Sequence, residues 1–78
     1  MNNKLLLIRF RCDGSLGDLQ KIDFHDCEIS QVGFGVFEAK IGPWDQISEA
    51  TKQPMTEGFI LRITRAGFEV PVVDSTII

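Results

Sequence analysis

The stretch KLLLIRFRC, residues 4–12, decides the fold that we expect. Alternate side chains of a strand point to opposite faces of a sheet. One face of this stretch is wholly apolar and carries Leu6, Ile8, Phe10 and Cys12. The other face changes from apolar, at Leu5 and Leu7, to cationic, at Arg9 and Arg11. A strand that is apolar on both faces at one end is usually covered on both faces there, so the pattern predicts a central strand.

The two segments that follow, residues 22–29 and 32–41, have the composition of strands but change the face of their apolar side chains partway along. The change falls near His25 in the first segment and near Phe37 in the second. A one-residue β-bulge reverses side-chain alternation in this way. We therefore expect two bent strands, preceded by a turn at residues 13–18.

Residues 59–65 and 68–73 have the composition of two more strands, separated by a tight turn at Ala66-Gly67. Pro71 lies in the second of these segments. Because proline has no backbone N–H to donate, it belongs on the edge of a sheet. The last strand is therefore expected to be an edge strand.

One helix is expected between the third and fourth strands. Pro43 suits the first position of a helix, and Asp45 favours the positive end of the helix dipole. Trp44 and Ile47 fall on one side of this helix, and Pro54 is expected to end it. A helix of about ten residues is not stable in water on its own, so we expect it to pack against the sheet.

The whole chain, residues 1–78, is expected to form a single domain that is mainly β with one short helix, in the order β-β-β-α-β-β. Bent strands favour a small coiled antiparallel barrel, OB-like or SH3-like. The alternative is an open α+β sheet with the helix on one face. The resemblance to the OB-fold is one of element order only, so no functional residues are carried over from it.

Composition indicates a folded, cytoplasmic protein. Hydrophobic residues make up 44% of the chain and charged residues 24%, with a net charge of −3. The apolar run after Lys4 is too short for a signal peptide or a membrane span. Cys12 and Cys27 are expected on the first hairpin at roughly 20 Å from each other, which is too far for a disulfide bond. We therefore expect two free thiols.

The sequence gives little support to catalysis or metal binding. His25-Asp26-Cys27 is the only compact cluster of candidate side chains, and a structural zinc site needs four converging ligands. A Cys27 nucleophile would need His25 in hydrogen-bond contact and a third group to orient the imidazole. We therefore expect no catalytic residues, no metal and no cofactor, and a protein that is not an enzyme.

A group of cationic side chains expected on the strands is compatible with nucleic-acid binding. Arg9 and Arg11 share one strand face, and Arg62 is expected nearby if the first and fourth strands are neighbours. Together with Phe34 or Phe37, these side chains could bind single-stranded nucleic acid. Arg side chains paired with strand carboxylates are the simpler interpretation. A single-stranded nucleic-acid-binding barrel is therefore the alternative function.

Apolar side chains in excess of what one helix can cover favour a binding role. The expected partner-binding residues are Leu5, Leu7, Ile60, Val73, Ile77 and Ile78. Exposed apolar surface of this kind marks an interface with another protein or with a second copy of the chain. The sequence thus predicts a non-catalytic protein-binding module, such as a small inhibitor, an immunity-type protein or an adaptor, with a mobile element or phage as one source.

Overall fold

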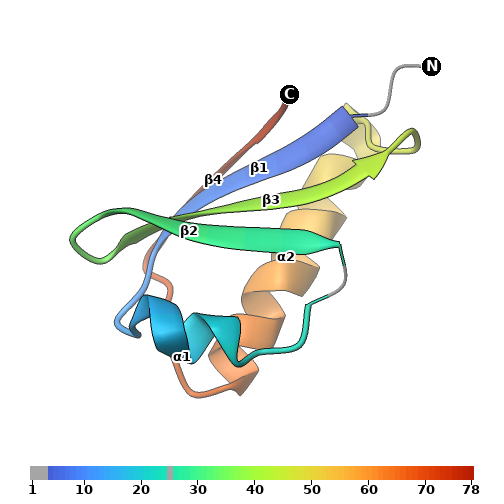
Figure 1. Cartoon of the computed structure of the whole chain (residues 1–78). Helices are drawn as coiled ribbons and strands as arrows, with labels where there is room; N and C mark the ends of the chain where they lie inside the picture. Colours follow the sequence, from blue (N-terminus) through green and yellow to red (C-terminus); the bar gives the residue numbers. More distant parts are fainter. Residues whose placement is uncertain (1–3, 25) are drawn as a thin grey trace.

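The computed structural model describes residues 4–24 and 26–78. Within these residues the chain forms an open, four-stranded antiparallel sheet with two helices on one face (Figure 1). The elements in chain order are β1 (Lys4–Arg11), α1 (Leu16–Gln20), β2 (Cys27–Gly33), β3 (Val36–Trp44), α2 (Glu49–Arg65) and β4 (Val72–Ile77).

The strands lie in the order β2-β3-β1-β4, and every neighbouring pair is antiparallel. Each helix therefore connects two strands that have a third strand between them. This is the split β-α-β topology, also called ferredoxin-like. β1 is central, as its two-sided apolar pattern predicts. The last strand is an edge strand as expected, but its predicted position, residues 68–73, is wrong: β4 begins at Val72, and Pro71 precedes it.

The core lies between the sheet and the two helices. It consists of the buried side chains Leu6, Ile8, Phe10, Cys12, Leu19, Phe37, Ala39, Ile41, Ile47, Phe59 and Ile63. Phe59 of α2 stands edge-on to Phe10 of β1, with ring centroids 5.4 Å apart, and stacks on Phe24 at 4.9 Å. Aromatic contacts of this geometry add to the stabilisation from apolar burial. Neither of the two described helices lies over the opposite face of the sheet (Figure 1).

The expected strand at residues 59–65 is wrong, because these residues form the second half of α2. Thr56, Phe59 and Ile63 are its buried side chains, and this spacing puts them on one helical face. Pro54 lies inside the helix and does not end it. A proline there removes one backbone donor, and we attribute its tolerance to the burial of the apolar face against the sheet.

The other end of the expected helix is also wrong. Pro43 and Trp44 are the last residues of β3, and α2 begins after its N-cap, Ser48. The expected turn at residues 13–18 includes the start of α1. The Ser15 hydroxyl accepts from the backbone N–H of Asp18 at 3.1 Å, and the Asp18 carboxylate accepts from the N–H of Ser15 at 3.3 Å. This capping box satisfies two otherwise unpaired donors and allows so short a helix to form.

The second expected strand begins at Cys27, later than predicted, and His25 lies outside the described residues. The change of face in residues 32–41 arises because a hairpin turn at Phe34-Gly35 divides that segment between β2 and β3. Gly35 has a φ of +69°, a conformation that glycine adopts without steric penalty. The irregular pairing falls between Gln31 and Gly33, not near Phe37.

The expected barrel is not confirmed. β2 and β4 are the two edges of the described sheet and do not pair with each other. The alternative expectation, an open α+β sheet with helical cover on one face, agrees with the arrangement. Among the described residues, no helix is long and apolar enough to cross a membrane.

Candidate functional site

The six side chains expected to bind a partner fall on both faces of the sheet. Leu5 and Leu7 lie on the open face, and Ile78 pairs with Leu5. Ile60 belongs to α2 and Val73 faces that helix, while Ile77 packs against the core. The six residues therefore do not form one apolar face: Ile60 lies on a helix, because residues 59–65 are helical, and Val73 faces that helix. What the two groups share is that both adjoin β4.

A groove runs between β4 and α2 on the helical side. Its lining residues are Thr56, Glu57, Ile60, Leu61, Thr64 and Val73. Val73 is 43% exposed and Leu61 is 47% exposed. Leu61 was not among the expected partner-binding residues, because residues 59–65 were expected to form a strand. Leu61 lies four residues after Glu57, so in a helix the two side chains share one face. This spacing is the sequence signal that places Leu61 on the outer side of α2.

The backbone of β4 has its outward hydrogen-bonding groups at odd-numbered residues. Leu5 and Ile78 exchange two backbone hydrogen bonds, of 3.0 and 2.9 Å. In an antiparallel pair, bonded and non-bonded positions alternate. The N–H and C=O groups of Val72, Asp74 and Thr76 therefore point to β1. Those of Val73, Ser75 and Ile77 point away from the sheet, where a further strand could bind them.

The two edges of the sheet differ in character. β4 has apolar residues at both ends, and Val72 and Ile78 are each 55% exposed. β2 is exposed along most of its length, but Glu28, Ser30 and Gln31 occupy its middle, and Val32 is its one exposed large apolar side chain. Polar and charged side chains on an edge strand discourage pairing with other chains. Of the two edges, β4 is the better suited to a protein partner.

The cationic side chains do not form one cluster. The Arg9 guanidinium binds the Glu38 carboxylate, with 2.9 Å between Arg9 Nε and Glu38 Oε2. Arg62 lies on α2 and donates from Nη1 to the backbone carbonyl of Asp23 at 2.9 Å. The structure therefore places Arg62 on the helical side of the sheet, whereas Arg9 and Arg11 lie on the open side.

The aromatic side chains expected to accompany these arginines are also separated. Phe37 is buried in the core, whereas Phe34 is fully exposed at the tip of the β2–β3 hairpin. Phe34 shares a shallow hollow with Arg11, but the carboxylate residues Asp13 and Glu69 line the same hollow. Carboxylates there oppose the approach of a phosphate backbone.

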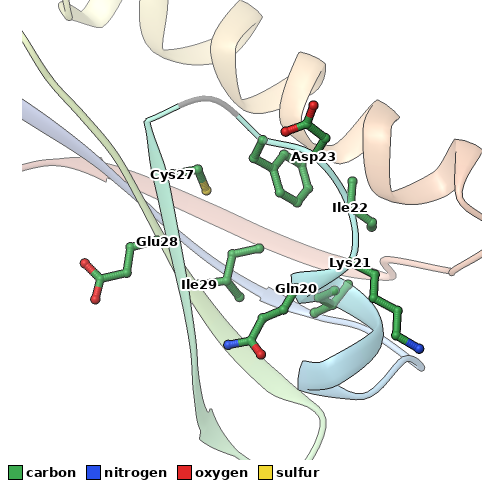
Figure 2. Close-up of a pocket in the computed structure, with 9 residues that line it drawn as sticks. Gln20, Lys21, Ile22, Asp23, Cys27, Glu28 and Ile29 are labelled. Atoms are coloured by element: carbon green, nitrogen blue, oxygen red, sulfur yellow. The ribbon is translucent and has the colours of Figure 1, made fainter.

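A second hollow lies beside β2, where the short α1 leaves the sheet only partly covered. Figure 2 shows Cys27 and Ile29 pointing from β2 toward the segment that carries Gln20 and Ile22, with Glu28 on the other side of the strand. The hollow has a volume of about 490 Å³. Aliphatic, aromatic, polar and charged side chains line it, among them the Cys27 thiol and the carboxylates of Asp23 and Glu28.

Both cysteines are free thiols, as expected. Burial raises the pKa of the Cys27 thiol to about 11. A thiol with a raised pKa holds little thiolate at neutral pH, and the thiolate is the reactive form. Across residues 4–24 and 26–78, no group of three or more His, Cys, Asp and Glu side chains is arranged to hold a metal ion. The expected His25–Cys27 contact involves a residue outside the described ranges.

Comparisons with known proteins place no further constraint on this site. No protein-family model, no curated protein and no solved structure matches the chain.

Proposed function

We propose that this chain is a non-catalytic, cytoplasmic protein-binding module, of the inhibitor, immunity-type or adaptor kind, that binds its partner along β4. The observation that carries the proposal is the β4 edge itself. Its outward backbone groups at Val73, Ser75 and Ile77 face away from the sheet, and exposed apolar side chains flank them on both faces. A partner strand added at this edge would gain backbone hydrogen bonds for affinity and side-chain contacts for specificity.

The groove beside α2 also favours β4 as the edge that binds the partner. A strand paired with β4 would lay every second side chain on the helical side, next to Val73, Ile60 and Leu61. The remaining side chains would lie on the open face, beside Val72 and Ile78. Burial of apolar surface contributes about 25 cal/mol per Å² to the free energy of binding. Apolar contacts on both faces would therefore stabilise the complex in addition to the backbone hydrogen bonds.

Two valines at opposite edges of the sheet provide a matched test. Val72 of β4 is 55% exposed and Val32 of β2 is 49% exposed. Val72→Lys and Val32→Lys therefore add the same charge at comparable exposure, one at each edge. Tagged wild-type and variant chains would be used for affinity capture from nuclease-treated and untreated lysate of the source cell, with circular dichroism to confirm folding.

We expect a captured protein that resists nuclease treatment, is lost with Val72→Lys and is retained with Val32→Lys. Equal capture by both variants would place the interface elsewhere and overturn the proposal. Capture that disappears after nuclease treatment would support the alternative, a single-stranded nucleic-acid binder that uses Arg9, Arg11 and Arg62.

A further inference from the structure

We propose that β4 pairs with β4 of a second copy of this chain, antiparallel and in a register centred on Ser75. Two open sheets would then join into one continuous sheet about a two-fold axis. The inference rests on the proposed function, because it assigns the partner of the same edge. A two-fold interface requires a surface that is complementary to itself, and the sequence of β4 meets this condition.

The order of side chains along β4 is symmetric about Ser75. The segment reads VVDSTII over residues 72–78, with two apolar residues, one polar residue, serine, one polar residue and two apolar residues. Reversing the strand about Ser75 therefore places apolar on apolar and polar on polar. It also pairs odd-numbered residues with odd-numbered residues, which the outward direction of their backbone groups requires.

The resulting cross-strand pairs are favourable on both faces. Val73 would lie opposite Ile77 of the second copy, and Val72 opposite its Ile78. The Val73 pair extends the apolar groove beside α2, where Leu61 is exposed. Apolar pairs directly opposite each other stabilise a sheet. Asp74 would lie opposite Thr76, so the one charged side chain of the segment meets a hydroxyl.

Neighbouring registers are less favourable. Shifting one copy so that Asp74 faces Asp74 keeps the backbone groups in phase, but it sets two carboxylates in a non-hydrogen-bonded pair with Cα atoms about 4.5 Å apart. Like charges directly opposite are destabilising. Shifting the other way sets Asp74 opposite Ile78 and leaves fewer residues paired. The register centred on Ser75 pairs the most residues without opposing charges.

β2 does not have this symmetry. A register centred on Ser30, the middle residue of β2, would place Glu28 opposite Val32 and Ile29 opposite Gln31. Each of these pairs joins a polar side chain to an apolar one. The self-complementary pattern is therefore a property of β4 and not of edge strands in this chain generally.

Disulfide trapping tests the register. In the proposed dimer the two copies of Ser75→Cys form a hydrogen-bonded pair with Cα atoms about 5.5 Å apart, within the disulfide range of about 4.4–6.8 Å. The control Val73→Cys lies opposite Ile77, and its own second copy is roughly 14 Å away along the strand. Mild oxidation should link Ser75→Cys into a covalent dimer, and should leave Val73→Cys and the wild type, with its native thiols, unlinked.

Charge pairing tests the interface without cysteine chemistry. Val72→Lys/Ile78→Glu places opposite charges across both ends of the dimer, whereas Val72→Lys/Ile78→Lys places like charges there. By analytical ultracentrifugation we expect the wild type and the Lys/Glu variant to approach twice the chain mass of 8.8 kDa as concentration rises. The Lys/Lys variant should remain at one chain mass, with an unchanged circular dichroism spectrum.

A wild type that stays at one chain mass at its highest soluble concentration would overturn the inference. Equal linkage of Ser75→Cys and Val73→Cys would overturn the register. These results differ from failure of the proposed function: a monomeric chain that still captures another protein in a Val72-dependent way retains that function and loses only the second copy as its partner.

Discussion

Leu5 donates its backbone N–H to the carbonyl of Ile78 at 3.0 Å, and Ile78 donates in return to the carbonyl of Leu5 at 2.9 Å. This reciprocal pair sets the direction of every backbone group on β4, because bonded positions recur at every second residue. Since Leu5 also belongs to the central strand, the same pair ties the outer edge of the sheet to its middle.

Amide hydrogen exchange should reveal this alternation. In dilute wild-type protein, we expect the amides of Asp74 and Thr76 to be protected and those of Val73, Ser75 and Ile77 to exchange faster, because only the first group donates to β1. When a partner strand binds, the second group should become protected. Uniform protection along β4 in dilute monomer would contradict the alternation; residue-resolved NMR exchange measures it.

Two glycines test the corrected position of α2. Gly58 lies inside the helix with no atom within 4 Å of an added Cβ, so Gly58→Ala should stabilise the fold by up to about 1 kcal/mol. Gly67 follows the C-cap with a φ of +102°, and Phe68 donates back to the carbonyl of Ile63 at 3.4 Å. Gly67→Ala should therefore destabilise by about 1 kcal/mol, since only glycine adopts this conformation freely.

Urea unfolding followed by circular dichroism would measure both changes. Opposite signs are expected for the two alanine substitutions. If residues 59–65 were a strand, Gly58 would lie in a loop before it, and Gly58→Ala would give no gain from helix propensity.

The sequence predicted the sheet better than the helices. β1 was identified as central from a local signal, its two-sided apolar pattern, and the last strand was expected at an edge because of Pro71, although β4 begins only after that proline. Residues 59–65, FILRITR, contain aromatic and β-branched side chains that favour a strand, yet Phe59 and Ile63 are also four residues apart, as a helical face requires. Whether this segment forms a strand or a helix depends on the burial of Phe59 against Phe10 and Phe24, which is a tertiary contact.

The candidate site was predicted in part for the same reason. Ile60 and Val73 were both expected to bind a partner and do line one groove, but Ile60 was expected on a strand, and Ile77 and Ile78 lie beyond the end of the strand expected at residues 68–73. A residue on a helix and one on an edge strand can line the same groove only if the helix packs beside that edge. Short-range alternation carries no information about this packing.

Phe59 connects α2 to the core of the sheet. It is 5% exposed and contacts the rings of Phe10 and Phe24. Phe59→Ala should destabilise by about 3–5 kcal/mol, which is comparable to the whole stability expected of so small a core. Phe59→Leu keeps an apolar side chain and should lose on the order of 1 kcal/mol.

Thermal unfolding would measure the two Phe59 variants. We expect the alanine variant to be largely unfolded at 25 °C or to melt without a cooperative transition, and the leucine variant to melt cooperatively at a lower temperature than the wild type. Similar melting of the alanine variant and the wild type would show that Phe59 is not in the core.

The Cys27 thiol should make stability depend on pH in the alkaline range. Burial raises its pKa from 9.0 to about 11 in the folded chain. As pH rises between these values, the unfolded chain loses the thiol proton while the folded chain keeps it. The unfolded state then binds fewer protons, so the free energy of unfolding falls with rising pH, whereas below pH 9 the contribution is fully present.

Cys27→Ala removes this titration and provides the comparison. We expect the difference in unfolding free energy between wild type and Cys27→Ala to be constant at neutral pH and to shift in favour of the variant between pH 9 and pH 11. Alkylation of Cys27 by iodoacetamide should correspondingly stay slow up to pH 9 in folded protein and become fast in urea. A difference that does not change with pH, together with rapid alkylation at pH 8, would show that the thiol is solvated and that β2 is not covered there by residues 19–24.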